Sequence, residues 1–176
     1  MQKDQNKRAQ FEQVILPHLN AAFNLARWLT KDDHAAEDVV QEAYYRAARY
    51  FGSFRGGDGR AWILGVVRRA SFDWLARRGR SVALMLDGEL QDREDESSDP
   101  VSQAIRRDDL ELVRAALEEL PPQLREVIVL RELEGMSYQA IAAVVEIPIG
   151  TVMSRLSRGR KQLQHRLSSR SEENAP

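Results

Sequence analysis

The sequence predicts an all-α protein of two small helical domains joined by a flexible acidic linker. Apolar residues recur at helical spacing through most of the chain, and β-strand alternation is absent. The 176 residues suffice for one domain or two small ones. Between Asp87 and Asp99, seven acidic residues accompany only one arginine. Such a segment has too few apolar groups to offset the entropy of ordering, so we expect residues 81–101 to form a flexible linker.

Composition excludes several classes of protein. The chain has no cysteine, which rules out disulfides, thiolate metal sites and a cysteine nucleophile. It has no run of about 18 apolar residues, so we expect no membrane insertion. Its polar N-terminus lacks the apolar core of a secretion signal. His18, His34 and His165 lie far apart in sequence, without nucleophile–base or metal-ligand spacing. We therefore predict no catalytic residue, no metal and no cofactor.

The first domain is expected over residues 8–80 and begins with helices. Apolar residues between 10 and 29 follow helical spacing, and Pro17 interrupts this run, where it can kink or divide the helix. Asp32 or Asp33 can then cap a helix over residues 35–51.

The first half of this capped helix is crowded with polar and acidic side chains. They are Glu37, Asp38, Gln41 and Glu42. Because a helix dipole favours acidic residues near the N-terminus, the cluster alone fits a solvated helix end as well as a binding surface.

A loop with four glycines follows at residues 52–60, and a further helix is expected over 60–78. The loop lacks the lysine and the preceding strand of a phosphate-binding loop. Between Arg55 and Arg80, seven arginines accompany two aspartates. Aromatic rings stack on bases and guanidiniums bind phosphates, so this stretch favours single-stranded nucleic acid. Trp62 and Trp74, each taken alone, are better explained as core residues.

The second domain is expected over residues 102–168. One helix should end at Pro121, and another should cover residues 123–133. Ser137 can cap the next helix, and Pro148 suits the first position of the last one. We expect residues 169–176 to be a disordered tail.

The last two predicted helices have the pattern of a helix-turn-helix. In the final helix, Val152 and Leu156 share an apolar stripe, and basic residues occupy the other faces. Six lysines and arginines lie between Met153 and Arg170, with no acidic residue, in a chain of net charge −1. Such a helix lays its N-terminal half in a DNA major groove, and segregated positive charge is typical of phosphate binding. A solvated amphipathic helix is the alternative for the basic face alone.

The order of these blocks resembles the extracytoplasmic-function sigma factors of bacterial RNA polymerase, from about residue 10 to 168. The string AEDVVQEAYYRA resembles the family's region-2 helix. The string FRGGDGRAWILGVVRRASFDWLARR resembles the part of region 2 that melts and reads the −10 promoter element. LPPQLREV, GMSYQAIA and IPIGTVMSRLSRGRKQL are similar to region 4, which reads the −35 element. The resemblance implies an alternative sigma factor, not an enzyme, that binds core polymerase, directs promoter-specific initiation and assists strand opening.

The resemblance also implies roles for individual residues. Docking on the clamp helices of the largest polymerase subunits is implied for Asp38, Gln41 and Glu42. Contacts with the −35 element are implied for Thr151, Met153, Ser154, Arg155, Arg158 and Lys161. Contacts with the −10 element are implied for Phe54, Arg55, Asp58, Arg60, Trp62, Arg68 and Arg69. The loop over residues 54–60 aligns with the loop that receives an unstacked base in the family.

Two departures from the family pattern affect promoter sequence. Arg69 stands where many members have an asparagine that helps to read the −10 element, and Met153 stands where a basic residue is frequent. The implied partners are core RNA polymerase (clamp helices and flap), promoter DNA and an anti-sigma factor. The resemblance implies a cytoplasmic stress-response protein that is nucleoid-associated when active and held by the anti-sigma factor otherwise.

Two other functions compete with this interpretation. A sigma-like mimic would sequester an anti-sigma factor without binding DNA, and it should lose the basic recognition face. Here that face keeps Arg155, Arg158, Arg160 and Lys161. A dimeric helix-turn-helix repressor would explain neither the AEDVVQE string nor the arginine-rich first domain.

Overall fold

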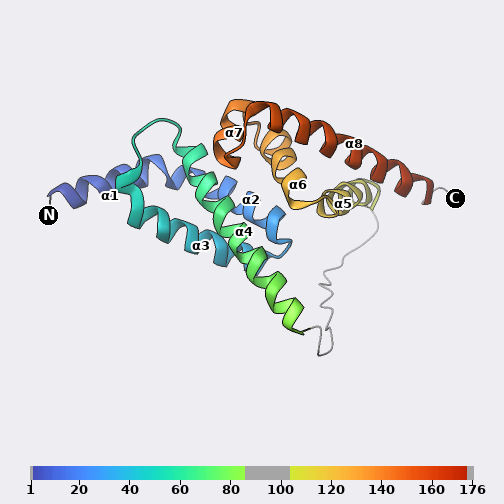
Figure 1. The fold of residues 1–176 in the computed structure, drawn as a ribbon, viewed down its shortest axis with the longest axis horizontal. Helices are drawn as coiled ribbons and strands as arrows, with labels where there is room; N and C mark the ends of the chain where they lie inside the picture. Colours follow the sequence, from blue (N-terminus) through green and yellow to red (C-terminus); the bar gives the residue numbers. More distant parts are fainter. Residues whose placement is uncertain (1, 86–103, 174–176) are drawn as a thin grey trace.

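The computed structural model describes residues 2–85 and 104–173, which fold entirely into helices and turns (Figure 1). Within these ranges there is no strand, so the all-α prediction is confirmed. Most of the acidic segment predicted as a linker, residues 86–101, lies outside the described residues.

The described helices form two groups, and within each group they follow one another through short turns. The first group is α1 (Gln2–Val14), η1 (Leu16–His18), α2 (Leu19–Thr30), α3 (Asp33–Tyr50), η2 (Phe51–Ser53) and α4 (Gly59–Met85). The second group is α5 (Ala104–Glu118), α6 (Pro122–Ile128), η3 (Val129–Leu133), α7 (Tyr138–Val145) and α8 (Ile149–Glu173). The elements η1 and η2 are 3-10 turns, and η3 is a π-helical continuation of α6.

Local sequence signals set several helix boundaries as predicted. Pro17 lies in the 3-10 turn η1, which divides the first apolar run into α1 and α2. The side chain of Asp32 accepts a hydrogen bond from the backbone N–H of Ala35, at 2.8 Å, and caps α3. Ser137 caps α7 in the same way through the N–H of Ala140, at 3.1 Å.

The turn between α7 and α8 differs by one residue from the prediction. Glu146 takes a left-handed conformation, with φ of 58°, and ends α7. Pro148 therefore lies just before α8, and its carbonyl accepts hydrogen bonds from the N–H groups of Thr151 and Val152. The proline was expected at the first helical position. It instead precedes α8, and its carbonyl accepts the first backbone hydrogen bonds of that helix.

Three helices, α1, α4 and α8, extend beyond the ranges expected from the sequence. In α8, the hydroxyls of Ser168 and Ser169 donate to the carbonyls of Gln164 and His165, each at 3.0 Å. Because these hydroxyls bond within the helix, they do not interrupt it. Residues 169–173, predicted as the start of a disordered tail, are helical as far as Glu173.

The two groups of helices pack against each other around one continuous core. Helix α4 packs on α7, and α2 packs on α6. The core joins Ile63, Leu64 and Val67 of α4 to Val144 and Val145 of α7. The sequence predicted two tethered domains but gave no sign of this contact between them.

Arg125 lies at the junction of the two groups and is only 2% exposed. Its guanidinium donates four hydrogen bonds. Three reach backbone carbonyls at the end of α5, those of Leu117, Glu118 and Leu120, at 3.0, 2.9 and 2.6 Å. The fourth reaches the carbonyl of Trp28 in α2, at 2.9 Å. The partial negative charge of a helix C-terminus therefore compensates this buried cation.

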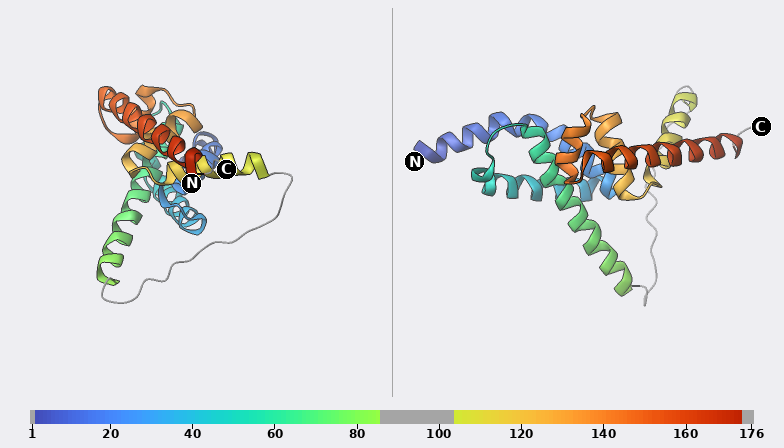
Figure 2. Two further views of the ribbon diagram at one scale, coloured as in Figure 1. Left: turned by 90° about the vertical axis from the view of Figure 1, so that its right-hand side faces the viewer. Right: turned by 45° about the horizontal axis from the view of Figure 1, so that its top comes forward.

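The C-terminal part of α4 projects from the packed body in the views of Figures 1 and 2. Residues 76–80 are all exposed there, and they include Arg77, Arg78 and Arg80. The guanidinium of Arg78 lies over the ring of Trp74, 5.1 Å from its centroid. Trp74 is therefore half-buried beneath an arginine.

Candidate nucleic-acid and polymerase interfaces

The N-terminal half of α8 buries one face and exposes the other. Val152 and Leu156 are 0% and 1% exposed. Ser154, Arg158 and Lys161 are exposed, and a helical repeat places them on one face together with the half-buried Thr151. Met153 beside them is 53% exposed. The helix therefore offers a polar and basic surface suited to a DNA groove.

Two close contacts fix α8 on the rest of its domain. A Cβ added to Gly159 would lie 2.9 Å from Cγ1 of Ile128, so α6 and α8 approach closely at this point. Arg155 differs from its neighbours because its guanidinium faces inward, 3.5 Å from the carboxylate of Glu126. Of the residues predicted to contact the −35 element, Arg155 is the one that faces the protein in this conformation.

The loop before α4 is shaped by two glycines and an aspartate. Gly56 and Gly57 have φ of 86° and 92°, in the left-handed region that glycine tolerates best. Asp58 accepts a hydrogen bond from the N–H of Ala61, at 3.0 Å, and caps α4. Arg55 is exposed. Asp58 thus has a structural role in addition to the −10 contact expected from the resemblance.

Phe54 and Trp62, both predicted near the −10 element, belong to an aromatic cluster. The ring of Phe54 stacks on Phe51 with centroids 5.5 Å apart, and it meets Trp62 edge-on at 5.4 Å. Both rings are half-buried. In this conformation they contact protein, which agrees with the interpretation of Trp62 as a core residue.

The three arginines of α4 in the predicted −10 set all face glutamates of the second group of helices. We call these three pairs the arginine–glutamate interface. They are Arg60–Glu134 at 2.6 Å, Arg68–Glu126 at 2.6 Å and Arg69–Glu146 at 3.0 Å.

Glu126 is the most enclosed member of this interface, with no exposed surface. Arg68 donates to both of its carboxylate oxygens, and Arg155 approaches one of them from α8. Burial raises the pKa of Glu126 above its ordinary value, while Arg68 and Arg155 act in the opposite direction. This carboxylate therefore joins α4 to the helix-turn-helix.

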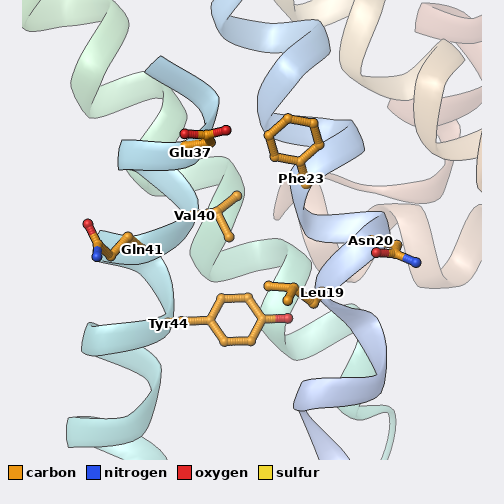
Figure 3. Close-up of a pocket in the computed structure, with 7 residues that line it drawn as sticks. All are labelled: Leu19, Asn20, Phe23, Glu37, Val40, Gln41 and Tyr44. Carbon is orange, nitrogen blue, oxygen red and sulfur yellow. The ribbon is translucent and has the colours of Figure 1, made fainter. Parts of the chain in front are cut away.

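A groove of about 620 Å³ lies between α2 and α3, beside the residues predicted to dock on polymerase. Leu19, Phe23, Val40 and Tyr44 point into it, and Glu37 and Gln41 lie at its edge (Figure 3). Asp38, Gln41 and Glu42 are exposed on α3 at positions that share one helical face. Burial raises the pKa of Tyr44 to about 12. The groove combines an apolar floor with an acidic edge.

Both halves of the chain match known families. The family model of sigma-70 region 2 matches residues 14–81, and that of sigma-70 region 4 matches residues 110–163. The ECF RNA polymerase sigma factor SigE of Mycolicibacterium smegmatis is 33% identical over 175 residues, which cover 98% of this chain and 67% of that protein. The chain belongs to the extracytoplasmic-function sigma factors.

Other relatives agree with this assignment. The RNA polymerase sigma-H factor of Pseudomonas aeruginosa is 34% identical to this sigma factor over 170 residues, covering 92% of this chain and 88% of that protein. The sigma factor RpoE of Bartonella quintana, solved in complex with the anti-sigma factor NepR, superposes with a TM-score of 0.74 at 31% identity. That match covers 90% of this chain and 97% of RpoE. The predicted family and function are confirmed: the protein is an alternative sigma factor that directs promoter-specific initiation of transcription.

In sigma-factor terms, the first group of helices contains region 2 and the second contains region 4. The structure brings Arg60, Arg68 and Arg69 together on one side of α4, against region 4. It leaves the predicted −35 and polymerase residues on separate, mostly exposed surfaces.

Sequence reasoning missed the glutamates that face the region-2 arginines and the buried Arg125. No local pattern distinguishes Glu126, Glu134 or Glu146 from solvated helix residues. Leu19 was assigned to an apolar helical stripe, yet it is 46% exposed and lines the groove. Its position beside Tyr44 of α3 becomes evident only in the folded chain (Figure 3).

Within the described part of the chain, no group of three histidines, cysteines, aspartates or glutamates could hold a metal ion. In the same ranges, no single helix is long and apolar enough to cross a membrane; only α7 and α8 taken together, bent by 99°, meet the length and composition requirement.

Proposed function

We propose that the exposed face of α8 reads the −35 element and that α4 with its preceding loop reads the −10 element. The observation that carries the proposal is the separation of α8 into a buried apolar side and an exposed side with Ser154, Arg158 and Lys161. An arginine can hold guanine O6 and N7 with two hydrogen bonds, whereas serine and lysine also bind phosphates. Arg158, exposed near the middle of this face, is the proposed base-reading residue.

In region 2, we assign the non-template strand to the loop over residues 54–60 and to the arginines of α4. Extruding a base from the duplex costs a few kcal/mol, so a preformed aromatic pocket with positive surroundings would favour opening. Phe54 and Trp62 provide the rings, and Arg55 provides exposed charge. Arg60 and Arg68, which are more enclosed than Arg69, would become fully available to phosphates when region 4 moves away.

The groove between α2 and α3 is the proposed docking site for a clamp helix of core polymerase. A helix binds such a groove through a row of apolar side chains, and charged side chains at the edge set its orientation. Glu37 and Gln41 supply an acidic and polar edge, and Asp38 and Glu42 extend the acidic surface of α3 beside it, which suits a basic partner helix. Region 4 would bind the flap of the same enzyme.

An anti-sigma factor is the proposed cytoplasmic inhibitor. The whole-chain similarity to RpoE, solved with its anti-sigma factor NepR, supports this assignment. An inhibitor that covers the groove would prevent polymerase binding without touching the recognition helix.

Run-off transcription tests the proposed function. Purified protein is added to core bacterial polymerase with a pool of promoter fragments from its own genome, and the start sites of specific transcripts are mapped. We expect transcripts that depend on this protein and share −35 and −10 sequences. Absence of both transcripts and polymerase binding would overturn the proposal and favour the sequestering mimic.

A further inference from the structure

We propose that region 4 holds region 2 closed by occupying, with three glutamates, the guanidiniums that would bind promoter DNA. In this arrangement DNA phosphates and region-4 carboxylates compete for Arg60, Arg68 and Arg69. The inference rests on the proposed −10 role of these arginines and adds a self-inhibited state that requires no second protein.

The pairing is one to one and crosses the boundary between the regions. Each arginine of the predicted −10 set on α4 has a different glutamate partner, supplied by α6, by the residue after η3 and by the end of α7. Glu134 has a second partner in region 2, because its carboxylate also accepts a hydrogen bond from Asn24 of α2, at 2.5 Å. Arg60 also donates to the backbone carbonyl of Glu134, at 3.0 Å.

The glutamates matter because closure would otherwise bury positive charge. The apolar contact between α4 and α7 favours closure, and a Cβ on Gly65 of α4 would lie 3.7 Å from the carbonyl of Val144. That contact brings Arg68, with an 18% exposed side chain, next to Arg155, whose side chain is 21% exposed. Without Glu126, two guanidiniums would share a nearly dry site, and an unpaired buried charge is strongly destabilising.

The three pairs do not contribute equally. The side chains of Glu126 and Glu134 are 0% and 10% exposed, so their pairs are shielded from salt. Both side chains of the Arg69–Glu146 pair are 59% exposed, and surface pairs of this kind stabilise little. The closed state therefore depends mainly on Glu126 and Glu134.

A fluorescence experiment tests the proposal on the full chain. Because the protein has no cysteine, Ala48→Cys in α3 and Gln162→Cys in α8 give two exposed labelling sites, one in each region. Energy transfer between dyes at these positions reports the separation of the regions. A short fluorescent single-stranded DNA of mixed sequence, followed by anisotropy, reports access to the arginines.

The test variant replaces the three glutamates with glutamine, which keeps their size and removes their charge. The control carries the same number of Glu→Gln changes outside the arginine–glutamate interface, so its net charge is identical. The test changes are E126Q, E134Q and E146Q. The control changes are E12Q, E111Q and E132Q; Glu12 and Glu132 pair with Arg8 and Arg160 within their own regions.

We expect the test variant to lose energy transfer and to bind the DNA about tenfold more tightly than the control, as for a closed state populated about ten to one. Energy transfer equal to that of the control would overturn the proposal. If energy transfer fell but the test variant bound the DNA no more tightly than the control, the proposed competition between DNA and glutamates for the arginines would be wrong. Both readouts are independent of polymerase, so they separate this inference from a failed transcription assay.

A second variant controls for misfolding that the substitution of the buried Glu126 could cause. It carries only E134Q and E146Q, is compared with E12Q and E132Q, and keeps Glu126 in place. Helical content by circular dichroism must equal that of the parent chain. A smaller change in the same direction supports the proposal, and no change in either readout contradicts it.

Discussion

Arg68 donates two hydrogen bonds to the carboxylate of Glu126, at 2.6 and 3.1 Å, and joins two helices that are 58 residues apart in sequence. The arginine belongs to the helix expected to bind the −10 element, and the glutamate supports the helix expected to bind the −35 element. The two helices expected to read the promoter thus meet at one buried carboxylate, which Arg155 of α8 also approaches, at 3.5 Å.

Arg158→Ala should weaken binding to the −35 duplex by about 1–3 kcal/mol if the guanidinium holds a guanine through two hydrogen bonds. Fluorescence anisotropy with the duplex mapped by run-off transcription measures the loss. Arg114→Ala on α5 is the matched control, because Arg114 is exposed and pairs with Glu118 in the same helix, away from the exposed face of α8. Unchanged affinity and unchanged sequence preference would remove Arg158 from the base-reading role.

Asp38→Lys combined with Glu42→Lys should abolish binding to core polymerase, because two acidic groups on the exposed surface of α3 become basic. Binding of the −35 duplex, which uses α8, should stay the same. Glu12→Lys with Glu111→Lys gives an equal change of charge elsewhere on the surface. Pull-down with core polymerase is the measurement, and normal binding by the first variant would refute docking at α3.

Gly59→Ala should destabilise region 2 by about 1–3 kcal/mol, the usual cost of overpacking. A Cβ at this position would lie 2.6 Å from Cγ1 of Val14 and 2.8 Å from its carbonyl oxygen, and backbone cannot easily yield. Gly79→Ala in the same helix is the contrasting variant, since a Cβ there meets nothing within 4 Å. That change should stabilise the helix by up to about 1 kcal/mol.

Thermal unfolding followed by circular dichroism separates these two glycine variants. Opposite shifts of the melting temperature are expected. If both alanines stabilised the protein, the contact between the start of α4 and the end of α1 would be looser than the structure indicates.

The sequence predicted the local structure well because its signals are local. Asp32 and Ser137 cap the helices for which they were proposed, and Pro17 divides the first apolar run. Helix periodicity and turn residues act over a few positions, so they can be read without knowledge of the fold. The basic and apolar sides of α8 follow from the same periodicity.

The contact between the regions could not be predicted in this way. Arg125 and Glu126 are charged residues in a predicted helix, and their natural interpretation is a solvated face. They are buried because partners from α2, α4, α5 and α8 converge on them, which is a property of the tertiary structure. The groove between α2 and α3 has the same origin, since it requires Leu19 and Val40 to line one surface from two different helices.

The hydrogen bonds of Arg125 have a consequence for how the protein could open. Three of its four bonds stay within region 4, and only the bond to the carbonyl of Trp28 crosses to region 2. Separation of the regions would break one of these four bonds, and the other three would still cap the end of α5. Around Arg125, region 4 can therefore move away from region 2 as a rigid body without local unfolding.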